Sequence, residues 1–183
     1  SISKIELPLT EDGCHIWRPF APNAKIRVAL NRSGWQWEGH GYFDSNFGTR
    51  ALEDDFSYWT WGRYPTEDGC ICLYDAIRLD GTVLQKAIHF DYTGMAKEVP
   101  LPQKKKMKRS RWGISRETRA DGAFQPVQIL NMLDAPFYSR SAVKTNLFGQ
   151  ETIGVHEALD LVRFRNPLMK PILAVRVPRR TNW

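Results

Sequence analysis

The sequence predicts an all-β protein made of antiparallel strands. Segments rich in Val, Ile, Thr, Tyr and Trp recur along the 183 residues, and Gly, Pro, Asn and Asp stand between them. Asp-Gly pairs separate neighbouring segments, as at Asp80–Gly81, and such a pair between two strands is a strong hairpin signal. No sustained apolar pattern has the period of an α-helix. Many short antiparallel strands with regular turns favour a barrel or a sandwich.

The expected strands follow one another along the chain, and a turn signal lies between most of them. The strands are Cys14–Phe20, Lys25–Leu30, Gly39–Phe43, Ser57–Arg63, Cys70–Leu79, Val83–Phe90, Trp112–Arg119, Val127–Leu133, Phe137–Leu147 and Thr152–Phe164. The turns are Pro65–Gly69, Leu79–Gly81, Asp91–Gly94, Ala120–Gly122 and Phe148–Gln150. Residues Arg50–Phe56 fit one turn of helix, and "NPLMKPILAV" near the end is ambiguous. Residues Glu98–Ser110 resemble a linker, because two prolines precede a basic run.

Length and composition are those of one globular domain, and we expect residues 1–183 to form a single one. Hydrophobic residues make up 42% of the chain, which is ordinary for a soluble protein. No apolar run approaches the roughly 20 residues that a membrane-spanning helix needs, and no signal peptide is visible. The chain contains seven Trp, nine Phe and six Tyr. So many bulky rings need an inward face, which favours a barrel with a ligand cavity.

The formal net charge is +6, and two short runs, Lys104–Arg111 and Arg176–Arg180, carry much of the positive charge. Such runs are usually solvated surface. Their functional interpretations are contact with an anionic membrane surface or with nucleic acid. We find no zinc-ligand spacing, helix-turn-helix pattern or RNA-binding signature, so the sequence argues against nucleic acid.

The three cysteines, Cys14, Cys70 and Cys72, are an odd number, which argues against a disulfide framework. Cys70 and Cys72 lie two residues apart, which places them on one face of a strand and differs from the CxxC spacing of metal and redox sites. We therefore expect all three cysteines to be reduced and structural. This usage fits a cytoplasmic protein.

One short stretch concentrates ionisable side chains. In "GHGYFDSNFG" (Gly39–Gly48), the alternate positions are occupied by His40, Tyr42 and Asp44. Because the side chains of a strand alternate between its two faces, these three share one face if the stretch is extended.

The same alternation groups other polar and aromatic residues. It puts His15 with Trp17, and Trp59 with Trp61. In "CICLYDAIRL", Asp75 shares its face with Ile and Leu side chains. A carboxylate on an apolar face is costly unless it is paired or neutral. The sequence thus predicts an aromatic-lined interior that holds a few acids and histidines.

Each of these residues also has a purely structural interpretation. The following fit core aromatic residues or core histidines that donate to a carbonyl: His15, His40, Tyr42, Trp59 and Trp61. Asp44 precedes Ser-Asn and fits a turn residue whose side chain bonds nearby backbone. Asp75 fits an ion pair with an arginine such as Arg63 or Arg78. Residue chemistry alone supports a β-barrel with an acid site in an aromatic pocket.

Several longer motifs carry a resemblance to a known family. The motifs are "HIWRPFAPNAKIRVAL", "WEGHGYFDSNFGTRALEDDFSYWTWGR", "LYDAIRLDG", "SRETRADG", "LDAPFYSRSAV", "VHEALDLVRF" and the terminal "PRR". They resemble the carotenoid 1,2-hydratase family, also called hydroxyneurosporene synthases. The combination of GHGYxDxNxG with WxWGR is long and unusual. The resemblance begins at about Cys14 and corresponds to the C-terminal half of longer family members.

The resemblance implies a lipocalin-like antiparallel β-barrel, one of two such halves in the complete family protein. It also implies cofactor-independent and metal-independent addition of water to the terminal C1–C2 double bond of an acyclic carotenoid of the neurosporene or lycopene type. The expected catalytic residues match the family's HxW and YxD patterns: His15, Trp17, Tyr42 and Asp44. The expected substrate-binding residues are His40, Trp59, Trp61 and Asp75.

Hydration of an isolated alkene begins with proton transfer to carbon, which gives a tertiary carbocation. The donor must be an acid that holds its proton near neutral pH. Burial favours the neutral form of a carboxyl, which makes Asp44 the expected acid. Trp17 and Tyr42 are expected to stabilise the cation with their ring faces. His15 or His40 would orient the attacking water and take its proton, and Tyr42 could instead keep the proton of Asp44 in place.

Two other functions would use the same pocket. A lipocalin-like cyclase or pericyclase folds a polyene without an essential acid, and a passive carrier binds a lipid or carotenoid and returns it unchanged. The expected partner in every case is an apolar polyene or terpenoid that resides in a membrane. We expect a cytoplasmic protein, peripheral at the inner membrane, that touches lipid through basic side chains: Lys104, Lys105, Lys106 and Lys108.

Overall fold

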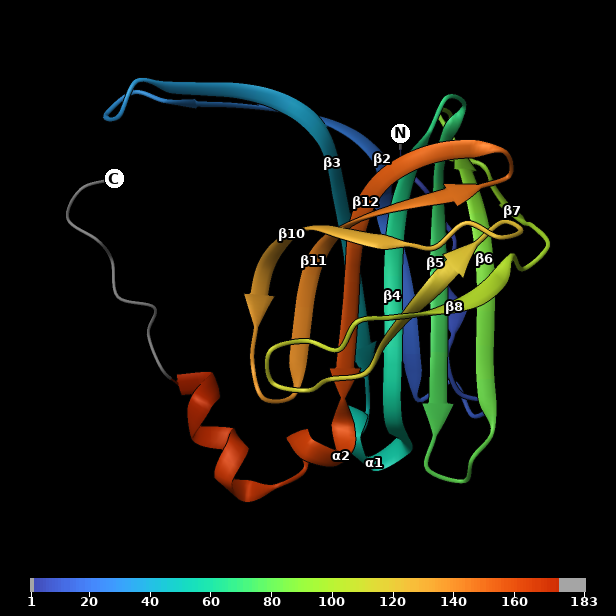
Figure 1. Ribbon diagram of the computed structural model, residues 1–183, viewed down its shortest axis with the longest axis vertical. Helices are drawn as coiled ribbons and strands as arrows, with labels where there is room; N and C mark the ends of the chain where they lie inside the picture. Colours follow the sequence, from blue (N-terminus) through green and yellow to red (C-terminus); the bar gives the residue numbers. More distant parts are fainter. Residues whose placement is uncertain (1, 175–183) are drawn as a thin grey trace.

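The structure, a computed structural model, describes residues 2–174 and consists mostly of β-strands (Figure 1). The strands are β1 (Leu7–Pro8), β2 (His15–Leu30), β3 (Trp35–Gly48), β4 (Phe56–Thr66), β5 (Gly69–Arg78), β6 (Val83–Asp91), β7 (Ala96–Glu98), β8 (Gln103–Met107), β9 (Arg116–Ala120), β10 (Val127–Asp134), β11 (Tyr138–Leu147) and β12 (Gln150–Asp160). The helices are α1 (Leu52–Asp55), α2 (Leu161–Phe164) and the 3₁₀ helix η1 (Pro167–Ala174). All pairings among the described strands are antiparallel, which confirms the predicted class.

The strands form three sheets in three layers. The middle layer is a seven-stranded sheet in the order β10-β11-β12-β4-β5-β6-β7. A three-stranded sheet, β1-β2-β3, packs on one face of it, where β2 contacts β5 and β6. The two-stranded sheet β8-β9 packs on the other face, where β9 contacts β4, β11 and β12. Strands β10 and β7 are the edges of the large sheet, and no ladder among the described strands joins them.

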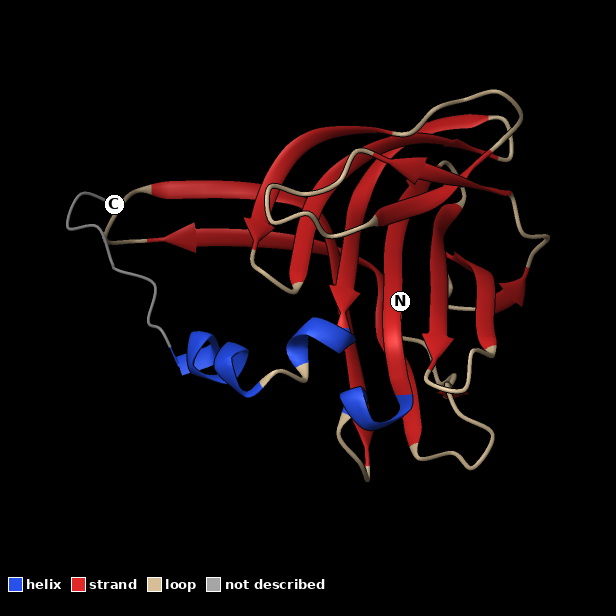
Figure 2. Ribbon diagram, turned by 60° about the horizontal axis from the view of Figure 1, so that its bottom comes forward, coloured by secondary structure: helices blue, strands red, loops and turns tan. Residues whose placement is uncertain are grey.

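Strand β2 is one continuous strand where the sequence predicts two, Cys14–Phe20 and Lys25–Leu30. Its pairing with β3 shifts register twice, in the segment that contains Pro19 and Pro22. Proline has no backbone N–H to give to a ladder, so these irregularities let the strand continue through both prolines. Beyond them, β2 and β3 run on as a long hairpin that projects from the body of the molecule (Figure 2).

Strands β8 and β9 differ from what the sequence predicts. The expectation that Glu98–Ser110 forms a linker is wrong, because β8 lies inside this stretch and pairs along its length with β9. The predicted strand Trp112–Arg119 begins only at Arg116. Gly113 has a φ of 75°, and this left-handed conformation interrupts an extended strand.

The large sheet has an apolar core on each face, and the alternation of side chains decides which residue enters which core. In β5, Cys70, Cys72 and Tyr74 belong to the core on the β2 side. Ile71 and Leu73 belong to the core on the opposite face. The shared face predicted for Cys70 and Cys72 is therefore confirmed, and none of the three cysteines forms a disulfide.

The helical segments lie together at the lower end of the molecule in Figure 1. Helix α1 falls within Arg50–Phe56, so the predicted turn of helix is confirmed. The segment that the sequence left ambiguous near its end contains η1. The basic run Arg176–Arg180 lies outside the described residues. Between residues 2 and 174, no helix is both long and apolar enough to cross a membrane.

Candidate active site

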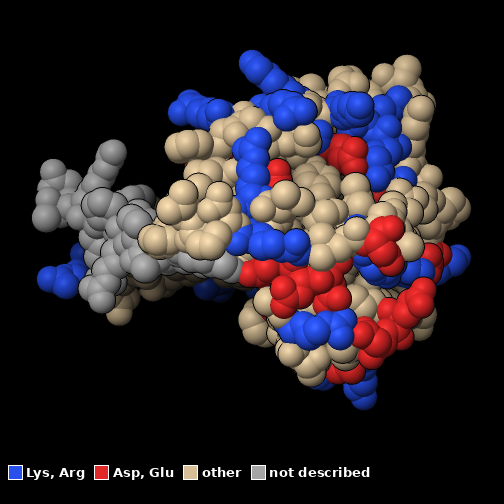
Figure 3. Space-filling view, turned by 90° about the horizontal axis from the view of Figure 1, so that it is seen from below, with Lys and Arg blue, Asp and Glu red and all other residues tan. Residues whose placement is uncertain are grey.

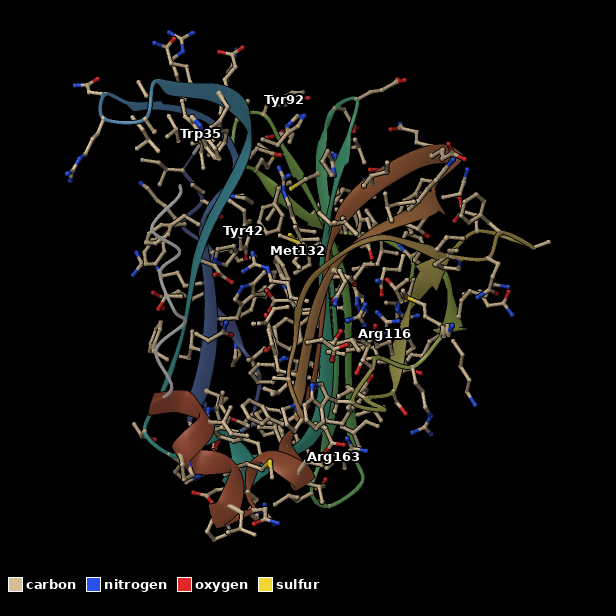
Figure 4. All side chains as sticks on the ribbon, turned by 60° about the vertical axis from the view of Figure 1, so that its left-hand side comes forward. Trp35, Tyr42, Tyr92, Arg116, Met132 and Arg163 are labelled. Carbon is tan, nitrogen blue, oxygen red and sulfur yellow. The ribbon has the colours of Figure 1, made fainter. Side chains whose placement is uncertain are left out.

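A cavity of about 600 Å³ lies between β3 and the face of the large sheet formed by β4, β5 and β10 to β12. In Figure 4, Tyr42 on β3 and Met132 on β10 lie near one another in the space between the sheets, and both line the cavity. The volume is typical of small-molecule sites, which span roughly 300–1,000 Å³. Across residues 2–174, no group of three or more His, Cys, Asp or Glu is arranged to hold a metal ion.

Asp44 lies on the cavity wall and accepts two hydrogen bonds on one carboxylate oxygen. Trp17 Nε1 donates to Oδ2 at 2.8 Å, and the Tyr42 hydroxyl donates to the same oxygen at 2.8 Å. Tyr42 stands two residues before Asp44 in β3. Trp17 comes from β2, where it pairs with Asn46, the next residue on that face of β3. The shared face predicted for Tyr42 and Asp44 is confirmed.

The other carboxylate oxygen of Asp44, Oδ1, is not held by a described residue. This atom is not among the enclosed polar atoms that lack a partner. Asp44 itself lines the cavity. The alternative interpretation as a turn residue does not hold, because Asp44 lies inside β3.

Tyr42 remains a neutral hydrogen-bond donor. Burial, followed by the influence of nearby Cys72 and Asp44, raises the pKa of Tyr42 far above its ordinary value. The phenol therefore keeps its proton and donates a hydrogen bond to the Asp44 carboxylate. Trp17 Nε1 also lies 3.2 Å from the Tyr42 hydroxyl oxygen, so Trp17, Tyr42 and Asp44 form a closed hydrogen-bonded triangle.

Aromatic rings cover the cavity wall beside this triangle. Trp59, Trp61 and Tyr74 all line the cavity. The Trp61 ring centroid lies 4.9 Å from that of Tyr42, and the Trp59 centroid lies 6.0 Å from that of Tyr74. Trp17 packs against Tyr74, with centroids 5.4 Å apart, but does not line the cavity. Trp17 therefore acts on the site through its hydrogen bonds, whereas the other rings present their surfaces to a ligand.

The structure separates the two predicted histidines. His40 lines the cavity and is exposed. His15 is buried and lines a different hollow of about 270 Å³. Its Nε2 lies 2.7 Å from Asp55 Oδ2 in α1. Arg50 donates to Asp55 at 3.0 and 2.8 Å and holds the pKa of that carboxyl below its ordinary value. Seen from below, the end of the molecule that carries the helical segments has acidic and basic side chains next to one another on its surface (Figure 3).

Asp75, which the sequence predicts as a substrate-binding residue, lies on the opposite face of the large sheet, away from the cavity. Arg119 of β9 donates to both of its oxygens, from Nε at 3.0 Å and from Nη2 at 2.5 Å. Lys104 Nζ lies 3.3 Å from the same carboxylate. The alternative of an ion pair with an arginine is therefore what forms, but its partner is Arg119 and not Arg63 or Arg78.

Three charged residues of the cavity wall are absent from the predicted site: Arg63 on β4, Glu157 on β12 and Arg140 on β11. Arg140 Nε lies 3.3 Å from Glu157 Oε1. Burial, with a smaller contribution from the charge of Asp44, raises the pKa of Glu157 above its ordinary value, although Tyr138 and Arg140 act in the opposite direction. A second carboxyl group therefore shares the cavity with Asp44.

The sequence contains a pattern that could have identified Glu157 as a candidate site residue. Ile153, Val155, Glu157 and Leu159 alternate along β12, so the Glu157 carboxylate stands between apolar residues on one face of the strand. The same pattern singled out Asp75. The pattern does not say which face of the sheet meets a cavity, because that depends on the layers packed above and below.

A family model described as "Carotenoid hydratase CrtC" matches residues 1–183. The acyclic carotenoid 1,2-hydratase of Cereibacter sphaeroides is 57% identical over 182 residues, and that of Rhodobacter capsulatus is 53% identical over 184 residues. Each match covers 100% of this chain and 65% of the relative. The chain thus spans about 65% of the length of these relatives. The acyclic carotenoid 1,2-hydratase of Thiocapsa roseopersicina is 38% identical over 90% of this chain and 41% of that protein.

The fold also has a solved counterpart. A crystal structure of a Nitrosomonas europaea protein, provisionally assigned as AttH, is similar with a TM-score of 0.57 and 15% sequence identity. The similarity covers 88% of this chain and 60% of that chain. At this level of identity, it concerns the fold alone.

Proposed function

The chain belongs to the CrtC carotenoid hydratase family, and from this premise we propose that it adds water, without a cofactor, to the terminal C1–C2 double bond of an acyclic carotenoid of the neurosporene or lycopene type. The observation that carries the proposal is the Asp44 carboxyl group. Asp44 lines an aromatic cavity, two donors hold its Oδ2, and no described residue donates to its Oδ1. The product would be a tertiary alcohol, and the enzyme class is that of a hydro-lyase.

The first step is proton transfer from Asp44 to carbon. In its protonated form, Asp44 gives the hydrogen on Oδ1 to C2, and the π electrons of the alkene form the new C–H bond. Positive charge is left at C1 and negative charge on the carboxylate. The hydrogen bonds from Trp17 and Tyr42 to Oδ2 strengthen as this negative charge develops. Interactions that are stronger in the transition state than in the ground state lower the barrier, so both donors assist the transfer.

The second step is stabilisation of the cation at C1. Trp59, Trp61 and Tyr42 line the cavity, and an aromatic face attracts a desolvated cation by about 2 kcal/mol or more. A gain of about 1.4 kcal/mol corresponds to a tenfold change in rate. The faces of these rings therefore lower the barrier to forming the cation.

Water then attacks C1 and loses a proton, and the two histidines have different places in this scheme. His40 lines the cavity and is available to water at its rim. His15 is a positioning residue in the proposal, because its contact with Asp55 fixes the start of β2, the strand that carries Trp17.

We propose that residues 1–183 act as one lipocalin-like, barrel-like domain in which the facing sheets enclose the polyene. Apolar side chains from both sides also line the cavity, among them Ile26, Met132 and Ile153. Apolar surface removed from water contributes roughly 25 cal/mol per Å². Affinity for a long hydrocarbon would come from this contact area.

A polyene dissolves in lipid, so the proposal includes a peripheral contact with the cytoplasmic face of the inner membrane. Lys106 and Lys108 are exposed, whereas Lys104 is bound to Asp75. An anionic membrane attracts each basic side chain near its surface by about 1 kcal/mol. Replacing Lys105, Lys106 and Lys108 with Gln should weaken binding to vesicles that contain anionic lipid. Unchanged binding would remove this contact from the proposal.

Incubation with lycopene in water enriched in ¹⁸O tests the reaction itself. A hydratase gives a product that carries the heavy oxygen in a hydroxyl group, detected by chromatography and mass spectrometry. A cyclase or pericyclase would give an isomer of unchanged mass, and a passive carrier would return lycopene. Either of these two results would contradict the proposal.

A further inference from the structure

Four cavity-lining side chains form a row across the large sheet. Tyr74 on β5 pairs directly with Trp61 on β4, Trp61 pairs with Glu157 on β12, and Glu157 pairs with Arg140 on β11. All four line the same cavity. Directly opposed residues in antiparallel strands point to the same face and lie close together. The row is therefore a continuous line of two aromatic and two charged side chains on the sheet that lies across the cavity from β3, the strand of Asp44.

Two polar atoms of this row have no protein partner. No described residue accepts a hydrogen bond from Trp61 Nε1 or bonds the Tyr74 hydroxyl, although both atoms are enclosed. The exposed fraction of Trp61 is 8% and that of Tyr74 is 2%. A buried donor without an acceptor is destabilising, and polar positions inside proteins are commonly satisfied by water. The row thus offers donors for a water molecule.

Glu157 stands beside these donors and supplies an acceptor. Its side chain is 22% exposed, and one carboxylate oxygen lies 3.3 Å from Arg140 Nε. Trp61, its other direct neighbour, contacts Tyr42 ring to ring at 4.9 Å, and Tyr42 holds Asp44. The indole of Trp61 therefore connects the Glu157 side of the cavity with the Asp44 side.

We propose that Glu157 is the general base of the hydration, which accepts a proton from a water molecule bound by its carboxylate and by Trp61 Nε1. This inference rests on the proposed function. After Asp44 has given its proton to C2, the water oxygen forms the bond to C1 with its lone pair, and the O–H bond that breaks leaves its proton on Glu157. Transfer of that proton to the Asp44 carboxylate through solvent restores the starting state.

The surroundings of Glu157 suit this role. The raised pKa that burial gives to the Glu157 carboxyl makes its ionised form a better proton acceptor. Arg140 and Tyr138 both contact the carboxylate, and its side chain is still 22% exposed. Neither histidine has equivalent neighbours, because His15 lies in a separate hollow and His40 is exposed.

Partitioning of the cation in D₂O tests the assignment. Asp44 then delivers a deuteron to C2, and the cation either captures water or returns a hydron to Asp44 and reappears as deuterated substrate. In Glu157→Gln, water capture should slow by about 100-fold or more, the contribution typical of a general base. Deuterium exchange into lycopene should continue, so the ratio of exchange to hydration should rise strongly.

Glu151→Gln is a matched control. Glu151 lies on the same strand and pairs with Lys144 of β11 at 2.6 Å, but it is exposed and does not line the cavity. This variant should keep the wild-type ratio. Glu157→Asp, which retains a carboxylate on a shorter chain, should give an intermediate ratio. Because the ratio is measured within one sample, it does not depend on how much of a variant is folded.

Three results are distinguishable. A wild-type protein that neither exchanges nor hydrates would overturn the proposed function. A Glu157→Gln variant that hydrates at the wild-type rate would overturn the assignment of Glu157 alone. A parallel loss of exchange and hydration in that variant would also overturn it, because a base for water is not needed to form the cation.

Discussion

Asp44 and Asp75 are two carboxylates that the sequence places on strand faces with apolar or aromatic neighbours, and the structure gives them opposite surroundings. Asp44 meets two neutral donors, an indole N–H and a phenol O–H. Asp75 meets two cations, Arg119 and Lys104. Asp44 lines a cavity and has one oxygen without a donor among the described residues, whereas Asp75 is only 5% exposed and both of its oxygens are bonded.

The comparison contrasts the carboxyl group that we propose as the proton donor with one that forms ion pairs. A buried charge is costly unless a counter-ion balances it, and the cations around Asp75 provide that balance while tying β5 to the layer of β8 and β9. Neutral donors balance a carboxylate less completely. Asp44 has such neutral donors and lines a cavity that a ligand can enter, which is why we propose it, and not Asp75, as the residue that meets the substrate.

The largest expected effect comes from Asp44→Asn. The amide keeps the size of the side chain but has no acidic proton to give, so hydration of lycopene should fall by about 10²- to 10⁴-fold. The melting temperature should stay within a few degrees of the wild type, because no buried cation loses its partner. Product formation and thermal unfolding measured on one preparation check both halves of the prediction.

Asp75→Asn should have the opposite pattern, with a large loss of stability and a small change in activity. It leaves Arg119 and Lys104 beside a neutral amide, and removing one partner of a buried ion pair costs roughly 3–5 kcal/mol. For a protein of this size the melting temperature should fall by about 10 °C. Hydration per folded molecule should change less than tenfold. An unchanged melting temperature would mean that the ion pairs of Asp75 contribute no stability.

Tyr42→Phe should have an intermediate effect on activity. It removes one hydrogen bond to the carboxylate, and bonds to charged groups contribute about 1.5–3 kcal/mol, so the rate should fall roughly tenfold to a hundredfold. Tyr64→Phe is the matched control, because the Tyr64 hydroxyl bonds Thr118 at 2.9 Å on the other face of the sheet. Equal losses of activity in the two variants would argue against a specific role for Tyr42.

The smallest effect concerns how the free energy of unfolding changes at acidic pH, through a histidine on the face of the large sheet that carries Asp75. His156 is buried there and bonds the Glu117 carbonyl at 2.8 Å, and burial lowers the pKa of His156 from 6.5 to about 4. The unfolded chain therefore binds more protons than the folded protein between these two values, so stability falls as the pH drops through this window. His156→Gln should flatten that part of the profile in urea unfolding. An unchanged slope would assign the acid sensitivity to other groups.

Local pattern was enough to predict which residues share a face. The period of two along a strand is a property of the backbone, so Tyr42 with Asp44 and Cys70 with Cys72 could be grouped without knowing the fold. The all-β class could be predicted for the same reason. The short helix α1 was visible because its residues break the alternation of the strands around it.

The packing of one layer on another could not be predicted in this way. Asp75 and Glu157 follow the same pattern, but only Glu157 faces the cavity, because sheet β8-β9 covers the opposite face. His15 joins Asp55, 40 residues away, and no local rule predicts that contact. The segment that contains β8 was predicted to be a linker because its own residues do not favour a strand. It forms a strand by pairing with β9, which the local sequence does not reveal.

The central claim is that Asp44 transfers a proton to carbon, and deuterium at C2 measures that step most directly. The wild type and Asp44→Asn are incubated with lycopene in D₂O, and deuterium at C2 is measured in both the product and the recovered substrate. We predict one deuterium at C2 of the wild-type product and none above background with the variant. Incorporation at the wild-type rate with Asp44→Asn would contradict the account.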